Sequence, residues 1–438
     1  MKRLNALKRN QGITLIALVV TIVVLLILAG ITINMLFGSD GIFKVAQDAA
    51  NAWNEATINE QSSLENLADQ IANLVNGQVG GGTGGGSDTP EELEPVDITT
   101  VTEIVQKEEG EKAKDTYGNV VVVPKGFKVV TSEATTVPEG IVIEDANGNQ
   151  FVWIPVGTVY KDSTGTNTST IKLGRYTFST SDGTPTLQQA AFAGDNESNA
   201  SQTYADEVTI SSSYKELTTY REGTVDNDNR LDDLNATAKN LAGFVQSVQE
   251  NGGYYIARYE ASYGSGSSTA DWKPLSKVST GTPRTSSSTT LTQGMLWNCV
   301  TQLDASKVSQ NMYANDSSVG VESDLINSYA WDTAIVFIKS MNEANSNYAN
   351  ANCDTTGNSS LMNTGETGDK VCNIYDMAAN VSEWTTEYCT DTVISNALPC
   401  GNRGGNCYYS SNYTAYRNRG SAADSYNEIG FRVSLYVK

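Results

Sequence analysis

The feature that most constrains this chain is an uninterrupted apolar segment near its N-terminus. Residues 13–36 read ITLIALVVTIVVLLILAGITINML, without a charged residue in 24 positions. A helix needs about 20 apolar residues to cross the hydrocarbon core of a bilayer, so the segment predicts one membrane-spanning helix. Four basic residues precede it within the first nine positions, and basic flanks stay in the cytoplasm. We therefore expect a single-pass cell-membrane protein with residues 37–438 outside the cell.

The junction in front of this segment resembles that of type IV prepilins. In that family a basic leader ends in glycine, a dedicated peptidase cuts after the glycine, and an apolar helix follows. Gly12 and Ile13 stand at the matching positions. The resemblance implies a leader over residues 1–12, cleavage between Gly12 and Ile13, and pilus or pseudopilus subunits as partners. Many pilins carry a glutamate that assists assembly where this chain has Ala17, so cleavage is better supported than filament assembly. An uncleaved signal anchor is the alternative.

Two segments separate the apolar run from a globular head. Residues 37–76 place apolar side chains mostly three or four positions apart, which predicts a helical stalk; coiled-coil packing would give the same pattern. Residues 77–97 begin with a glycine-rich run and continue into an acidic spacer, which predicts a flexible linker. We expect the head to open with a β extension over residues 98–147.

Composition excludes several classes of function. The chain has 50 acidic and 29 basic residues, a net charge of −21, and no histidine. Such an acidic chain does not favour nucleic-acid binding, which needs clustered Lys and Arg. Without histidine, Ser-His-Asp and Cys-His catalysis are impossible. Six cysteines in an exported region favour at least one disulfide, with Cys400 paired to Cys407 or Cys389 as local candidates.

Hydrophobic patterns in the head predict a mixed fold. Residues 328–343 predict an amphipathic helix with Trp331, Ala334, Ile335, Ile338 and Met341 on one face. Residues 160–225 are polar and predict long surface loops, and residues 234–249 predict a further helix. The predicted strands are residues 120–123, 127–130, 141–143, 151–154 and 254–260, with Asn147-Gly148 as a hairpin turn between the third and fourth.

Several motifs in the head occur in the order of a known family. They are FVWIPVG over 151–157, GYYIARYE over 253–260, YAWDTA over 329–334, NIYDMAANVSEW over 373–384, RGG over 403–405 and IGFR over 429–432. Together they resemble the formylglycine-generating enzyme and sulfatase-modifying-factor superfamily, over residues 148–438. The resemblance implies an α+β, C-type-lectin-like domain rich in irregular structure, carried here on a transmembrane helix and a helical stalk.

Departures from the family pattern argue against its chemistry. In the enzymes, two cysteines that bind copper lie four and nine residues after the second glycine of the Gly-Gly turn. Here those positions are Tyr409 and Thr414, and Ala379 replaces a usual glycine. We therefore expect no oxidase activity and no required cofactor. Some family members bind calcium near the motif that ends in Trp384, which makes Asn380 and Glu383 candidate Ca²⁺ ligands.

The superfamily also includes non-catalytic ligand binders, among them the variable proteins of diversity-generating retroelements. Residues 406–421 hold four Tyr, three Asn and three Ser in 16 residues, a composition typical of adaptable binding surfaces. We expect this segment to bind an extracellular protein or glycan. The candidate ligand-binding residues are Asn406, Tyr408, Tyr409, Ser411, Asn412, Tyr413, Tyr416 and Asn418. The alternatives are an enzyme, such as an oxidase of the family, and a purely structural minor pilin.

Overall fold

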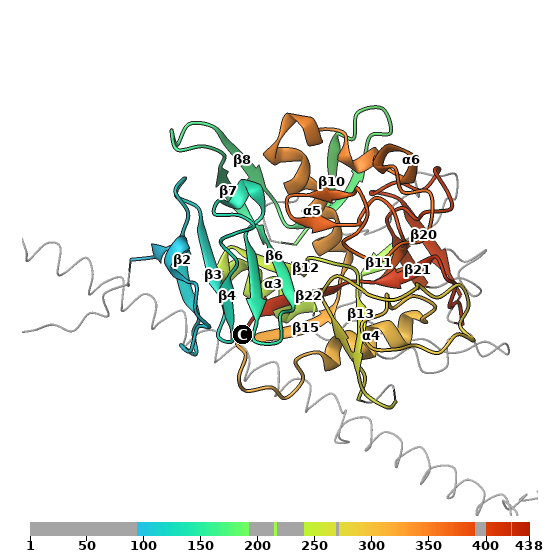
Figure 1. The fold of residues 1–438 in the computed structure, drawn as a ribbon. Helices are drawn as coiled ribbons and strands as arrows, with labels where there is room; N and C mark the ends of the chain where they lie inside the picture. The colour runs from blue at the N-terminus through green and yellow to red at the C-terminus, as the bar shows by residue number, and fades with distance from the viewer. Residues whose placement is uncertain (1–93, 192–213, 217–240, 269–270, 390–399, 422) are drawn as a thin grey trace, which may run out of the picture. The chain divides into compact units, whose positions relative to one another are not determined.

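The computed structural model describes residues 94–191, 214–216, 241–268, 271–389, 400–421 and 423–438 (Figure 1). All of them belong to one compact unit, which spans residues 92–438. The predictions for Gly12, Ile13, the apolar segment and the stalk fall outside the described residues. Among the residues that are described, no helix combines the length and apolarity needed to cross a membrane.

A small sheet opens the described fold. It joins β1 (Val96–Asp97), β2 (Glu111–Lys114) and β3 (Val120–Val123) in that order, with a short 3₁₀ turn, η1 (Ile98–Thr100), after β1. Strand β1 lies within residues 77–97, which the sequence assigns to the linker, so regular structure begins earlier than expected. The predicted strand over residues 120–123 is confirmed as β3.

The main sheet is antiparallel and has six strands in the order β15-β22-β12-β6-β5-β4. The hairpin predicted at Asn147-Gly148 joins β5 to β6, and Gly148 has φ +80°, a region that glycine enters without strain. The strands are β4 (Phe127–Val129), β5 (Val142–Asp145), β6 (Gln150–Pro155), β12 (Gly253–Ala257), β15 (Val321–Leu325) and β22 (Val433–Val437).

Successive side chains of β12 contact different layers of the fold, helices on one face of the main sheet and the small sheet on the other. The Tyr254 hydroxyl donates to the carbonyl oxygen of Ala330 in α5 (Ser328–Met341) at 2.7 Å, and its ring packs on Phe244 of α3 (Leu241–Asn251). The Tyr255 hydroxyl donates to the carbonyl oxygen of Val122 in β3 at 2.8 Å. Because neighbouring strand residues point to opposite faces, helices cover one face and the small sheet contacts the other.

Helix α5 confirms the helix predicted from residue 328. The side chain of Asn327 caps it by accepting a hydrogen bond from the Ala330 backbone N–H at 2.9 Å, as expected of a good N-cap residue. Its environment differs from the prediction of one apolar face, since residues 328–338 are all buried. Asp332 and Thr333 are polar, but they can be buried because Arg403 and the backbone N–H of Gly174 donate hydrogen bonds to their side chains.

A second sheet carries the C-terminal motifs. It runs β11-β18-β19-β20, and β21 pairs with β18 in parallel. Strands β21 and β22 are separated only by Arg432, so this residue lies where the chain passes from one sheet to the other. The strands are β11 (Tyr214–Glu216), β18 (Ser382–Cys389), β19 (Cys400–Arg403), β20 (Arg417–Gly420) and β21 (Ile429–Phe431).

Residues 160–191 correct the prediction of long surface loops. They form two hairpins, one joining β7 (Gly157–Tyr160) to β8 (Thr168–Ile171) and one joining β9 (Gly174–Phe178) to β10 (Pro185–Ala190). Their apolar side chains are few but well spaced: Ile171, Leu173, Tyr176 and Phe178 are all buried. Polar residues between them hide the alternation from a composition argument.

The remaining elements are short. The hairpin β13 (Ser262–Ser265) to β14 (Lys273–Leu275) and helix α4 (Gln302–Asn311) build the pocket described below. The expected helix over residues 234–249 is found as α3 over its described residues, and it ends at Asn251. The others are η2 (Val137–Glu139), η3 (Glu343–Asn345), η4 (Tyr348–Asn350), α6 (Cys353–Thr356), β16 (Lys370–Val371) and β17 (Ile374–Tyr375).

The structure bears on one of the two expected cysteine pairs, Cys400–Cys407. Cys299, Cys353, Cys372 and Cys407 carry free thiols, so the predicted Cys400–Cys407 bridge is not formed. Burial raises the pKa of the Cys407 thiol to about 12, as expected of a cysteine that serves as a small buried residue. The side chain of Cys389 lies outside the described residues.

Candidate functional site

A buried ion-pair network fixes the strands on either side of the predicted binding segment. The guanidinium of Arg403, in the Arg-Gly-Gly motif, pairs with Asp332 of α5. Arg417 of β20 pairs with Asp332 at 3.0 Å and with Glu387 of β18 at 2.9 Å. Arg175 of β9 also pairs with Glu387. We call these five residues the ion-pair frame; all of them are buried.

The frame positions a segment whose exposure is uneven. Of the eight predicted ligand-binding residues, Tyr408, Tyr409 and Ser411 are exposed, whereas Tyr413, Tyr416 and Asn418 are half-buried. Tyr413 and Tyr416 pack edge to face, with ring centroids 5.6 Å apart. Asn406 and Asn412 are buried, and the Asn406 side chain accepts hydrogen bonds from the backbone N–H groups of Tyr408 and Tyr409. Asn406 therefore shapes the turn that presents the two tyrosines.

Tyr408, Tyr409 and Tyr426 are exposed aromatic residues, and Asn427, the neighbour of Tyr426, contacts Tyr408. The exposed fractions of the three tyrosines are 48%, 54% and 53%, high values for such large apolar rings. Asn427 donates a hydrogen bond to the Tyr408 hydroxyl at 3.0 Å, which ties the turn at residues 425–427 to the tyrosine segment. We call Tyr408, Tyr409 and Tyr426 the tyrosine face.

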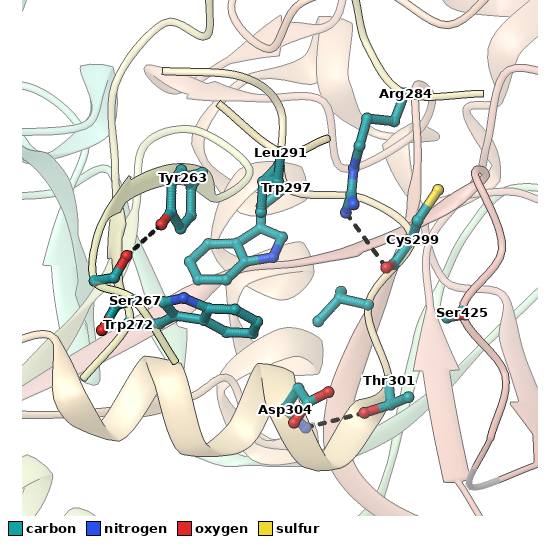
Figure 2. A pocket seen from close by; sticks show the side chains of 12 residues that line it. Tyr263, Ser267, Trp272, Arg284, Leu291, Trp297, Cys299, Thr301, Asp304 and Ser425 are labelled. Carbon is teal, nitrogen blue, oxygen red and sulfur yellow. Dashed lines mark hydrogen bonds between the residues drawn. The ribbon is translucent and has the colours of Figure 1, made fainter. Parts of the chain in front are cut away.

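A pocket of about 420 Å³ adjoins the same turn (Figure 2). One side carries the rings of Tyr263, Trp272 and Trp297, which pack edge to face with centroids 5.1 to 6.5 Å apart. Figure 2 shows these rings grouped together, with Arg284 and Cys299 beside them. The polar lining also includes Ser267, Thr301, Asp304 and Ser425. We call this the aromatic pocket.

The wall at Cys299 has an unusual backbone. Cys299 has φ +52°, a left-handed conformation that costs energy in a residue with a side chain. Its carbonyl oxygen accepts a hydrogen bond from Arg284 Nη2 at 3.3 Å, and its N–H donates to the carbonyl oxygen of Tyr426 at 3.1 Å. One strained residue thus links the arginine of the pocket to the tyrosine face.

Asn298 completes that link from the other direction. Its side-chain amide donates to the carbonyl oxygens of Arg284 and of Asn427, each at 2.7 Å. Since Asn427 also binds Tyr408, a continuous chain of hydrogen bonds runs from the aromatic pocket through residues 425–427 to the tyrosine face. The two features are therefore connected through the interior of the fold by the buried side chain of Asn298.

The candidate calcium ligands lie in the core and have protein partners. Asn380 donates to Glu260 at 2.6 Å and accepts from the Met362 backbone N–H at 3.0 Å. Glu383 pairs with Arg432 at 2.6 Å. Within the described ranges no group of three or more His, Cys, Asp or Glu side chains is arranged to hold a metal ion. Calcium binding at Asn380 and Glu383 stays a prediction.

The same core region holds more carboxyl groups than cations. Glu260, Asp369, Asp376 and Glu383 are all buried around Arg432. Burial, with repulsion from neighbouring carboxylates as a smaller cause, raises the pKa of Asp369 to about 7. Burial likewise raises the pKa of Glu383 to about 7, although Arg432 opposes the shift. Because these carboxyl groups are buried, their raised pKa values affect the stability of the fold rather than ligand binding.

The positions that matter for catalysis in the resembled enzymes are also occupied differently. Tyr409 is exposed and Thr414 is buried, with its backbone carbonyl oxygen accepting from the Trp331 indole at 3.1 Å. Ala379 has no positive φ, which explains why glycine is not required there. Position 414 therefore supports the α5 contact in this chain.

Sequence reasoning did not find the aromatic pocket. Its residues come from four separate stretches, and Trp272 and Arg284 lie in a segment, residues 262–290, whose polar composition predicts a loop. The one available signal was Trp272, a large aromatic residue within that polar stretch.

Comparisons with known proteins add little to this geometry. No protein-family model and no curated protein matches the sequence. Among solved structures, one described as the crystal structure of CarF matches with 15% identity and a TM-score of 0.20, over 28% of this chain and 50% of that chain. The chain thus spans half the length of that neighbour, and a likeness this weak carries no inference about fold or function.

Proposed function

We propose that this is a pilin-like surface protein, held in the membrane by residues 13–36, whose C-terminal head binds an external protein or glycan without catalysis. The apolar segment and its basic leader support the anchoring. The head supplies the binding surface. The anchor keeps that surface outside the cell, where a ligand from the surroundings reaches it.

One observation carries the proposal: the tyrosine face and the aromatic pocket are joined by hydrogen bonds on a scaffold that buried ion pairs hold. Tyrosine offers a large contact area with few rotatable bonds, and aromatic residues dominate binding energy at interfaces. The frame keeps β19 and β20 in place on either side of residues 406–416. The exposed side chains between them are free to contact a ligand while the fold stays intact.

The absence of catalysis is supported by the residues at the matched positions. Copper chemistry of the family type needs two convergent thiolates, and the two positions here hold Tyr409 and Thr414. Cys407 is near in sequence, but burial keeps its thiol protonated by raising its pKa to about 12. Incubating the full chain with copper and a peptide containing Cys-x-Pro-x-Arg should leave the peptide thiol unchanged; aldehyde formation above the enzyme-free level would contradict this.

The binding role is tested with the tyrosine face. The detergent-solubilised full chain is applied to arrays of glycans and extracellular-matrix proteins, as wild type and as Tyr408→Ala with Tyr409→Ala. Losing two exposed aromatic contacts should cost about 2 kcal/mol or more, which weakens binding of the strongest ligand by roughly 30-fold. Thermal stability should change little, because both rings are about half exposed.

The matched control removes exposed apolar surface elsewhere. Val96 of β1 and Val120 of β3 are 36% and 42% exposed, and Val96→Ala with Val120→Ala should leave array binding at the wild-type level. Equal losses in the two double variants would show that the effect is not specific to the tyrosine face. Undiminished binding by the tyrosine variant would contradict the proposed surface.

The anchoring is tested separately. N-terminal sequencing of the protein extracted from membranes should begin at Ile13 if the prepilin-like leader is removed after Gly12. A chain that begins at Met1 would leave the uncleaved signal anchor, with the head still outside the cell. A Gly12→Val variant should block the cut and serves as the marker for the unprocessed form.

A further inference from the structure

Arg284 has no carboxylate partner among the described residues, unlike the buried arginines Arg175, Arg258, Arg403, Arg417 and Arg432. It is 6% exposed, yet its guanidinium donates only to the backbone carbonyl oxygens of Asn298 and Cys299, both through Nη2. Its Nε is buried without a hydrogen-bond partner. Burial lowers the pKa of the guanidinium, but an arginine stays charged at neutral pH.

The unused donor capacity of Arg284 points to an anion. Guanidinium groups bind carboxylates through paired N–H donors, and Nη1 makes no hydrogen bond to any described residue. Nη1 is not fully buried, and Arg284 lines the aromatic pocket. An enclosed positive charge beside an open cavity attracts a negative group, since the interior screens it less than water does.

The aromatic side of the pocket points to a ring-shaped, partly apolar ligand. Trp297 is 2% exposed and rests on Phe431 of β21 with centroids 5.5 Å apart, so it forms a fixed wall. Trp272 and Tyr263 are half-buried and extend this wall toward solvent. A pocket lined by rings, with a few fixed polar groups, is the usual form of a small-ligand site.

Helix α4 and its N-cap contribute one hydrogen-bond donor and one acceptor to the pocket. The Thr301 hydroxyl oxygen caps the helix by accepting from the Asp304 backbone N–H at 3.1 Å, which leaves the hydroxyl hydrogen available for a ligand. The Asp304 side chain is half-buried, lines the pocket and has no ion-pair partner within the described part of the chain. A carboxylate acceptor of this kind suits ligand hydroxyl groups.

We propose that the aromatic pocket binds a pyranose that carries one carboxylate, as a single acidic residue of a glycan outside the cell. The sugar carboxylate accepts from Arg284 Nη1, the C–H face of the ring packs on the half-buried Trp272, which Trp297 supports from behind, and ring hydroxyls donate to Asp304. The proposal rests on the binding role proposed above and names the chemical class of its ligand.

A singly charged ligand fits better than a phosphate or sulfate ester cluster. The pocket supplies one arginine, and it also contains the Asp304 carboxylate, which repels a multiply charged anion. The chain as a whole carries a net charge of −21, so long-range attraction for polyanions is absent. The cavity of about 420 Å³ holds one or two sugar rings rather than a long segment.

The test compares acids with their neutral counterparts of the same shape. Calorimetry with the detergent-solubilised full chain uses three singly charged acids, methyl galacturonoside, methyl glucuronoside and sialyllactose, each compared with its own methyl ester. At least one acid should bind about tenfold or more tightly than its neutral counterpart. The Arg284→Gln variant should lose this preference and bind both members of the pair with the same weak affinity.

Two further variants keep the test decisive if Arg284→Gln folds poorly. Asp304→Asn removes the negative charge of the pocket and keeps its size, so it should strengthen binding of the acid by severalfold relative to the neutral sugar. Trp272→Ala should weaken both members equally, because the ring contacts are independent of ligand charge. Thermal melting of each variant without ligand confirms that the head is folded.

The outcomes separate this proposal from the general binding role. If an acid and its neutral counterpart bind equally well, and Trp272→Ala weakens both, the head binds sugars but the carboxylate assignment is wrong. If no acid in the panel binds while an array ligand still requires Tyr408 and Tyr409, the binding role stands and the acidic-sugar proposal is overturned. Unchanged acid preference in Arg284→Gln would overturn it as well.

Discussion

The ion-pair frame and the aromatic pocket bury the same kind of charge in opposite ways. In the frame, each of Arg175, Arg403 and Arg417 meets a carboxylate of Asp332 or Glu387. In the pocket, Arg284 meets only backbone carbonyl oxygens. The frame completes its electrostatics inside the protein, whereas the pocket leaves a charge for a partner that comes from outside.

The difference has a physical basis in the cost of desolvation. Taking a charged group out of water costs several kcal/mol, which a buried pair recovers only with good geometry. The frame recovers it through short contacts, such as the two between Arg417 Nε and the Glu387 carboxylate at 2.9 and 3.0 Å. Without a ligand, part of the desolvation cost of the Arg284 guanidinium is not offset. An anion bound beside the guanidinium would offset it.

The carboxyl groups around Arg432 form a third region, in which the excess buried charge is negative. Around Arg432, the carboxyls of Glu260, Asp369 and Glu383 all have raised pKa values, mainly because they are buried. A carboxylate becomes neutral by taking up a proton. An arginine would have to lose a proton to become neutral, and it stays charged at neutral pH. Proton uptake therefore lowers the cost of burying charge in the acidic cluster. At Arg284 that cost is lowered only when an anionic ligand binds.

The largest expected effect is in the frame. Arg403→Gln leaves Asp332 with one fewer buried partner and removes the cation beside the Trp331 ring. Breaking a buried pair from one side costs about 3–5 kcal/mol. Chemical denaturation at pH 7 should show a loss of stability of that size. A loss under about 1 kcal/mol would mean that the frame does not hold the C-terminal strands.

The acidic cluster predicts an intermediate effect that depends on pH. A carboxyl with its folded pKa raised stabilises the fold below its unfolded pKa, and this contribution is lost as pH rises through the folded value. For Asp369 that window runs from about 4 to about 7. Lowering the pH from 8 to 5 should stabilise the head through this group by on the order of 2 kcal/mol.

The Asp369→Asn variant isolates that contribution. An amide can still accept from the Ala378 backbone N–H and donate to the Tyr348 hydroxyl, so the two contacts of Asp369 are kept. Stability measured by denaturation at pH 5 and at pH 8 should differ less in the variant than in the wild type. An unchanged difference would assign the pH dependence to other groups.

The smallest expected effect on stability is at Arg284. The substitution Arg284→Gln is the same chemical change as in the frame, but it breaks no ion pair among the described residues and removes a charge that lacks one. We expect the free energy of unfolding without ligand to fall by about 1 kcal/mol, the cost of the hydrogen bonds to the carbonyl oxygens of Asn298 and Cys299. A loss as large as that of Arg403→Gln would show that Arg284 is structural, and the contrast between the two regions would disappear.

The sequence predicts those parts of the fold in which local pattern and burial agree. The strand over residues 120–123, the Asn147-Gly148 hairpin and the helix from Ser328 are found as predicted. The hairpins β7–β8 and β9–β10 were missed, because their apolar residues are stabilised by contacts with α5 rather than by a strong pattern of their own. The all-round burial of α5 depends on Asp332 having arginine partners from distant strands, which no local window contains.

The candidate site was predictable only in part, for the same reason. Tyr408 and Tyr409 are exposed as a binding role requires, but Asn406 and Asn412 are buried and Tyr413 and Tyr416 are half-buried. A composition argument treats these positions alike, since it ignores which side chains the turn directs inward. The aromatic pocket combines Trp272, Arg284, Trp297 and Ser425, which the fold brings together across more than a hundred residues.

The most direct test of the account is hydrogen exchange on the full chain, with and without the strongest ligand from the arrays. Binding at the joined surface should slow exchange in the backbone amides of residues 263–301 and 406–416 and leave β19, β20 and the other strands of the frame unchanged. Protection confined to other parts of the head, with these two segments unaffected, would contradict the claim that the aromatic pocket and the tyrosine face form the binding site.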